Sequence, residues 1–182
     1  GPMARTVDDC ALLLSVLAGP HPRCPLSIQE SGKTFTPVIK PKASGLRIAF
    51  SADFDRQIPI SRLVVSQIQK NRVIFEELGC RVSDYCPDLT GGREAFHVLR
   101  AHRFAQRHGQ GVQQSPEAYK ATILWNVSQG LQLTRDDLTH AEQLRAALHQ
   151  RMTHLFQKFD FLVTPVVQVL PFDGDIEYVT EI

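Results

Sequence analysis

The chain has 182 residues, enough to bury a core, and its 43% hydrophobic and 21% charged residues are typical of a soluble globular protein rather than a disordered one. The formal net charge is +1, and lysine and arginine are scattered along the sequence, which argues against nucleic acids and anionic membranes as partners. No apolar run is long enough to cross a bilayer and no secretory signal is found, so we expect a cytoplasmic protein.

The first predicted element, within residues 1–19, is a helix that follows Thr6. Thr6 and Asp9 have the spacing of a capping box, and Asp8 and Asp9 suit the positive end of a helix dipole. The residues that follow are almost continuously apolar, and Gly19 and Pro20 end the run. We therefore expect a helix that is buried on most sides.

Residues 20–44 are predicted to form an irregular connection over the protein surface. Five prolines and one glycine interrupt this stretch between residues 20 and 41. Connections of this length without structure of their own are unusual in compact domains and often lie across a larger body. We expect no functional site in it.

Residues 45–86 are predicted to form a strand, a helix and a second strand. A short apolar run follows Gly45, a helix opens at Ser61 and ends at Gly79, and residues 80–85 alternate in character. A strand, a helix and a strand at this spacing form a crossover unit. We therefore expect two parallel strands with a right-handed connection.

Residues 87–159 are predicted to form a helical layer. Gly91-Gly92 is typical of a turn before a helix, which spans about residues 94–108, and Gly109-Gln110-Gly111 is expected to end it. Ser115-Pro116 is expected to open the next helix, and Thr134 with Asp137 caps a long third one.

Residues 160–182 begin with a predicted short buried strand. The segment after this strand has the character of a truncated end. The strand covers Phe161–Thr164 and is stopped by Pro165.

The sequence contains no motif for a nucleophilic serine, a metal or a dinucleotide. There is no Gly-x-Ser-x-Gly or Gly-Gly-Ser turn, and Ser66 and Lys70 are expected to lie on a solvated helix face. The histidine spacings do not suit a metal site, so we expect neither a metal nor a cofactor. None of the four cysteines forms a Cys-x-x-Cys pair, which favours reduced thiols, although a disulfide is left open.

Three stretches resemble the amidase signature family of serine hydrolases. Gly-Pro-Met-Ala-Arg-Thr-Val at residues 1–7 is similar to the segment that opens a helix shortly after the family's catalytic serine loop. Phe-Asp-Phe-Leu-Val-Thr-Pro at residues 159–165 and Leu-Trp-Asn at residues 124–126 also match family patterns, in the family's order and spacing. Gly1-Pro2 is also what a protease leaves after removing an affinity tag, but the family motif requires the same pair.

The resemblance implies an α/β fold, with all 182 residues forming a portion of a large mixed β-sheet sandwiched by helices and containing at least one parallel β-α-β crossover. The family's serine, second serine with a cis peptide bond, and lysine match no residue here. We therefore expect the catalytic residues to lie outside this chain. The residues that the resemblance places at the substrate are Thr164, Pro165 and Val166, bordered by Trp125 and Asn126.

The function implied is hydrolysis of a carboxamide or short amide through an acyl-enzyme, with a small-molecule amide as substrate. Arg5 is expected to anchor the opening loop by pairing with a carboxylate outside the chain. Two alternatives stay open: the amidase-like subunit of a tRNA-dependent amidotransferase, and an inactive scaffold or interaction module. By itself the chain should expose apolar surface and self-associate, for example as a homodimer.

Overall fold

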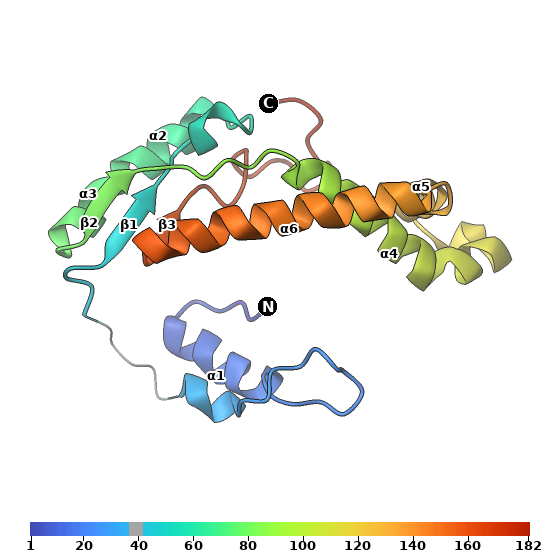
Figure 1. The fold of residues 1–182 in the computed structure, drawn as a ribbon, viewed down its shortest axis with the longest axis horizontal. Coiled ribbons are helices and arrows are strands. Elements are labelled where there is room, and N and C mark those ends of the chain that lie inside the picture. The colour runs from blue at the N-terminus through green and yellow to red at the C-terminus, as the bar shows by residue number, and fades with distance from the viewer. Residues whose placement is uncertain (37–41) are drawn as a thin grey trace. The chain divides into compact units, whose positions relative to one another are not determined.

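The computed structural model of the chain describes residues 1–36 and 42–182 (Figure 1). These residues form two compact units, Gly1–Ala43 and Ser44–Ile182. Of the predicted surface connection, Pro37 and Pro41 lie outside the described residues, and the described part contains one short 3-10 helix, η1 (Gly32–Phe35).

The first unit consists of α1 (Val7–Leu17) and η1, which pack against each other. The predicted helix start is confirmed, because the Thr6 side chain accepts a hydrogen bond from the Asp9 backbone N–H at 3.1 Å. The contact between the two helices requires Gly32. A Cβ at that position would lie 2.7 Å from the Ala18 carbonyl oxygen, so a larger residue would push the helices apart.

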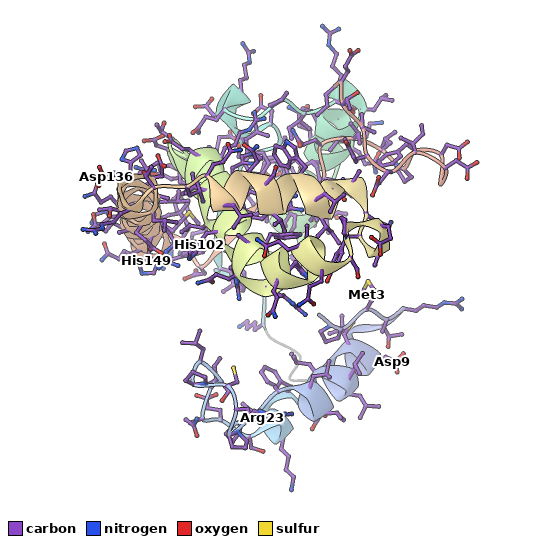
Figure 2. All side chains as sticks on the ribbon, turned by 90° about the vertical axis from the view of Figure 1, so that its right-hand side faces the viewer. Met3, Asp9, Arg23, His102, Asp136 and His149 are labelled. Carbon is purple, nitrogen blue, oxygen red and sulfur yellow. The ribbon has the colours of Figure 1, made fainter. Side chains whose placement is uncertain are left out.

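The expectation that this first helix is buried on most sides is not met within the first unit, and for the whole chain it stays a prediction. No residue of α1 is buried, and Val7 and Val16 are 72% and 77% exposed. Met3, ahead of the helix, is also exposed (Figure 2). The physical reason is size, since η1 has four residues and is too short to cover an apolar helix of 11 residues.

The second unit is built on a three-stranded parallel sheet with the strand order β2-β1-β3. The strands are β1 (Arg47–Phe50), β2 (Arg81–Asp84) and β3 (Phe161–Val163), at the positions that the sequence predicts. The expected burial of the third strand is not observed, because β3 pairs with β1 at an edge of the described sheet and Phe161 is 54% exposed. The central strand is part of the core of the unit, because Ile48, Ala49 and Phe50 are all buried. Consecutive apolar residues suit a strand that is covered on both faces. The α/β class and the parallel crossover are confirmed.

The connection from β1 to β2 contains a 3-10 turn, η2 (Phe54–Arg56), and two helices, α2 (Arg62–Lys70) and α3 (Arg72–Glu77). The sequence predicts a single helix here. It is interrupted at Asn71, whose side-chain amide donates to the Gln67 carbonyl at 2.8 Å. The predicted end is confirmed, since Gly79 has the positive φ of a helix-terminating residue (81°).

The helical layer contains α4 (Gly92–Gln114), α5 (Ala121–Leu131) and α6 (Arg135–Lys158), and α4 packs against the other two (Figure 1). The predicted turn at Gly91 and the predicted capping box of Thr134 and Asp137 are confirmed. Two expectations are wrong. Gly109-Gln110-Gly111 lies inside α4, and Ser115-Pro116 opens only the 3-10 helix η3 (Pro116–Ala118).

Gly111 is needed for side-chain packing rather than for a turn. The Tyr119 hydroxyl occupies the place where a Cβ of residue 111 would stand, so the glycine makes room for a side chain while the helix continues.

An ion pair fastens the ends of β1 and β3, 113 residues apart in sequence. The Asp160 carboxylate accepts from the Arg47 backbone N–H at 2.8 Å and from the Arg47 guanidinium at 2.7 Å and 3.2 Å. In return the Asp160 backbone N–H donates to the Arg47 carbonyl at 2.8 Å. These hydrogen bonds fix the register in which the last strand joins the sheet.

The ion pair predicts an acid sensitivity of the fold. Hydrogen bonds from the Arg47 side chain and backbone hold the pKa of Asp160 at about 2, below its ordinary value of 3.8. A depressed folded-state pKa stabilises the protein above the ordinary pKa, and this stabilisation is lost as pH falls from about 4 to about 2. Asp160→Asn should therefore lower the melting temperature at neutral pH and reduce its decline in acid, as measured by circular dichroism. Asp175→Asn is the control, and equal melting of the two variants would contradict the assignment.

The contact between α4 and α5 predicts opposite effects for two helical glycines. Alanine normally stabilises a helix interior over glycine by about 1 kcal/mol. At Gly109 a Cβ would meet no atom within 4 Å, whereas at Gly130 it would lie 2.8 Å from the Ala105 Cβ and closer still to the Ala101 carbonyl. Urea titration should show that Gly109→Ala stabilises the chain and Gly130→Ala destabilises it by about 1–3 kcal/mol. Stabilisation by both would disprove the close helix contact.

Candidate functional site

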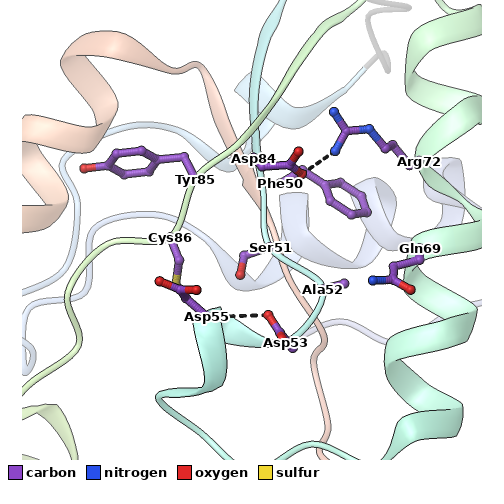
Figure 3. A pocket seen from close by; sticks show the side chains of 10 residues that line it. All are labelled: Phe50, Ser51, Ala52, Asp53, Asp55, Gln69, Arg72, Asp84, Tyr85 and Cys86. Carbon is purple, nitrogen blue, oxygen red and sulfur yellow. Dashed lines mark hydrogen bonds and ion pairs between the residues drawn. The ribbon is translucent and has the colours of Figure 1, made fainter.

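A cavity of about 450 Å³ lies where β1 and β2 end, at the carboxyl edge of the sheet (Figure 3). This edge is where open parallel sheets usually bind ligands, because the loops that leave the strands diverge there. The lining residues come from the ends of both strands, the segments that follow them, and the two crossover helices: Phe50, Ser51, Ala52, Asp53, Asp55, Gln69, Arg72, Asp84, Tyr85 and Cys86.

The floor of the cavity ends in a left-handed turn. Phe54, Asp55 and Arg56 have φ angles of 53°, 52° and 60°. Residues other than glycine rarely adopt this backbone conformation, which costs about 1–2 kcal/mol per residue. The turn is braced by the Asp53 carboxylate, which accepts from the Asp55 N–H at 3.0 Å. The strained turn presents the carboxylates of Asp53 and Asp55 to the cavity.

Gln57 ties this turn to the chain that follows β2. Its side-chain amide donates to the Pro87 carbonyl at 2.9 Å and accepts from the Leu89 N–H at 2.6 Å. The two loops at the carboxyl edge are thus held together by one side chain, which fixes the width of the cavity between them.

Arg72 forms the cationic wall of the cavity and is engaged by neighbouring groups. It pairs with Asp84 and with Glu76, at 2.9 Å for the latter, and it lies over the Phe50 ring with its guanidinium carbon 5.4 Å from the ring centre. The hydrogen bond to Glu76, followed by that to Asp84, raises the pKa of Arg72. Because its charge is already balanced, the carboxylates of Asp53 and Asp55 leave the cavity with a negative character.

Cys86 and Ser51 also line the cavity, near these carboxylates (Figure 3). Ser51 is buried, and its hydroxyl is a hydrogen-bond partner of the Cys86 thiol. Burial raises the pKa of Cys86, and the nearby charges of Asp55 and Asp53 raise it further. A neutral thiol is a poor nucleophile, so the cavity can bind by hydrogen bonds and charge but has no activated nucleophile.

The residues predicted to border the substrate do not line this cavity. Thr164, Pro165 and Val166 follow β3 at the same carboxyl edge, where Pro165 is buried and Val166 is 98% exposed. Their role in binding stays a prediction.

Trp125 and Asn126 lie on α5 in the helical layer and also stand apart from the cavity. Asn126 is buried and donates to the Thr122 carbonyl of its own helix at 2.7 Å, while Trp125 is exposed. The predicted roles of these two residues and of the exposed Arg5 stay predictions.

Sequence reasoning missed the residues that do line the cavity, above all Ser51, Asp53 and Asp55. One signal was available, since polar residues follow a buried strand directly. Ser66 and Lys70 are both exposed, and among residues 1–36 and 42–182 no group of three or more His, Cys, Asp or Glu side chains could hold a metal ion. In the same residues no helix is long and apolar enough to span a membrane.

A family model described as Amidase matches residues 1–180. The chain is 25% identical over 175 residues to an amidase from Pseudomonas putida, a match that covers 93% of this chain and 36% of that protein. It is 26% identical over 172 residues to an acylamidase from Rhodococcus erythropolis, covering 92% and 35%. The chain therefore spans about a third of the length of these curated relatives.

Two further similarities are informative. A glutamyl-tRNA(Gln) amidotransferase subunit from Pseudomonas savastanoi pv. phaseolicola is 35% identical over 105 residues, which are 54% of this chain and 20% of that protein. A solved bacterial aryl acylamidase of the amidase signature enzymes superimposes with a TM-score of 0.80 at 20% identity, covering 93% of this chain and 36% of that one. The latter match shows a shared fold.

The half-buried position of Cys86 predicts slow modification at the cavity. At pH 8 in the native state, iodoacetamide should alkylate exposed Cys24 several-fold faster than Cys86, because the raised pKa of Cys86 keeps its thiol protonated and its surroundings limit access. The rate at Cys86 should rise steeply as pH is increased further. Peptide mass spectrometry over time measures both sites, and the denatured chain is the control. Equal native rates would show that the cavity floor is open.

Proposed function

The chain belongs to the amidase family, and on that premise we propose that it forms part of a hydrolase that cleaves a carboxamide or a short amide through an acyl-enzyme. The observation that carries the proposal is the family match over residues 1–180, supported by the similarity to an amidase and an acylamidase along more than nine-tenths of the chain. None of the four cysteines is part of a Cys-x-x-Cys pair, which supports a reducing compartment such as the cytoplasm.

In this proposal the chain supplies scaffold and part of the binding wall, and the bond-breaking serine and lysine belong to other sequence. The absence of a nucleophile motif and the neutral Cys86 thiol support this division. Thr164 would offer one hydroxyl to the acyl part of the amide, beside the apolar atoms of Pro165 and Val166. Trp125 and Asn126 would border the same cleft, and Arg5 would anchor the opening loop.

A second candidate is the amidase-like component of a tRNA-dependent amidotransferase. The 35% identity over 105 residues to such a protein favours it, although the match covers only 54% of this chain. An inactive scaffold is the third. The exposed apolar side chains of α1 would make such a chain self-associate, for example as a homodimer.

The proposal predicts that the chain alone is inert toward a serine-hydrolase probe. A fluorophosphonate should label the Pseudomonas putida amidase but not the purified 182-residue chain, and a panel of aryl amides should be hydrolysed only by the former. Gel fluorescence and product absorbance are the measurements. Labelling or turnover by the chain itself would contradict the placement of the catalytic serine outside it.

A chimera provides the positive arm of this test. The matching third of the Pseudomonas putida amidase is replaced by this chain, and the folded product should hydrolyse a carboxamide. A chimera that melts cooperatively and reacts with the fluorophosphonate, yet releases no ammonia from any amide tested, would favour the inactive scaffold.

A further inference from the structure

One exposed face of α4 carries an unbroken row of basic and aromatic side chains. Residues three or four apart share a helix face, and the relevant positions recur at that spacing along four turns. All of the following are exposed and together form what we call the arginine stripe: Arg93, Phe96, His97, Arg100, Arg103 and Arg107.

The charges of the arginine stripe are not balanced by carboxylates in the described part of the second unit. Arg47, Arg72, Arg145 and Arg151 each form an ion pair, whereas none of the stripe's four arginines has a carboxylate within ion-pair distance among the residues that the structure describes. The single acidic residue of α4, Glu94, lies near His140 of α6 instead, at 3.4 Å. Within the described residues of the second unit, the stripe is therefore a cationic surface without a paired carboxylate.

The stripe is also partly ordered before any partner arrives. The Arg100 guanidinium carbon lies 5.6 Å from the centre of the Phe96 ring and 5.3 Å from that of Phe104, on which it stacks. His97 stands edge-on to Phe96 at 5.7 Å and accepts from Arg93 Nε at 3.5 Å. Stacking restrains the arginine stem and leaves the N–H groups available, which lowers the entropy lost on binding an anion.

We propose that the arginine stripe binds the phosphodiester backbone of a single-stranded nucleic acid. Guanidinium groups bind phosphate oxygens with two parallel hydrogen bonds. At 1.5 Å per residue the stripe extends for about 21 Å, long enough to follow several phosphates of an extended strand. Phe96, 57% exposed between the arginines, offers an aromatic edge against which a base can pack.

Other anionic partners fit the stripe less well. An anionic membrane would require an apolar band beside the charges, but Phe96 is the single exposed large hydrophobic side chain of α4. An acidic peptide would use the charges and leave the exposed ring unused. The combination of unpaired arginines with an accessible aromatic ring is the one that single-stranded nucleic acids use.

Given this fold, the expectation that nucleic acids are not partners no longer follows from the sequence. That expectation depended on basic residues being scattered along the sequence. The four arginines of the stripe are three to seven residues apart, so they look scattered when the sequence is read in order. In a helix, this spacing places them on one face. This inference does not depend on the proposed hydrolase activity.

Fluorescence anisotropy with a labelled RNA of about 12 nucleotides, titrated with the full 182-residue chain at several salt concentrations, tests the proposal. The logarithm of the binding constant should fall with the logarithm of the salt concentration with a slope near −3, about −0.7 for each of four phosphate contacts. The triple variant Arg100→Gln, Arg103→Gln, Arg107→Gln should bind about tenfold more weakly or worse and reduce the slope by about 2 units.

The matched control removes the same charge elsewhere in the second unit. Arg62, Lys70 and Arg135 are exposed and lie outside the stripe, so their triple glutamine variant should retain the parent slope. Phe96→Ala should weaken RNA binding without changing the slope, because stacking releases no counterions. Circular dichroism verifies that all variants fold.

Three outcomes would overturn the proposal: no RNA binding at low salt, equal losses in the two triple variants, or binding of polyglutamate of equal charge as tightly as RNA. The last would assign the stripe to an acidic protein. A parallel titration with single-stranded DNA of the same sequence distinguishes the sources of the phosphodiester backbone. Tighter binding of RNA than of DNA identifies RNA as the ligand, and equal binding supports the shared backbone chemistry.

Discussion

The second unit depends on the pairing of one short central strand with two partners that come from far apart in the sequence. β1 hydrogen-bonds to β2 on one side and to β3 on the other, and its three apolar residues are the most deeply buried run of the unit. The Asp160 carboxylate accepts hydrogen bonds from both the backbone and the side chain of Arg47, the first residue of β1. All three strands therefore end at the same edge, where the cavity and the segment after β3 lie.

The elements that could be predicted are those specified by local chemistry. The caps at Thr6, Ser61 and Thr134 form as expected, because each satisfies backbone N–H groups within three residues of itself. The strands follow from short apolar runs. Gly109 and Gly111 mislead because glycine indicates a turn only where φ must be positive, and inside α4 these glycines keep helical geometry.

Burial and the site depend on what lies alongside in space, which a linear pattern does not contain. The apolar composition of α1 predicts burial, but within the first unit η1 does not supply the covering surface. The cavity requires the loops after β1 and β2 to meet, and its left-handed turn is made by Phe54, Asp55 and Arg56 rather than by glycines, so no residue type announces it. The family resemblance points to the segments that contain Thr164 and Trp125, whose role in binding stays a prediction, whereas their surroundings come only from the coordinates.

The separation of β1 from β3 also has a consequence for biosynthesis. A ribosome that adds about 5–20 residues per second needs roughly 5–25 s to make the 113 residues between Arg47 and Asp160. In the later part of that interval, once β2 has been made, β1 can pair on one flank while its other flank stays open. Until β3 emerges, we expect this open edge to be the part of the nascent chain most prone to pairing with other chains.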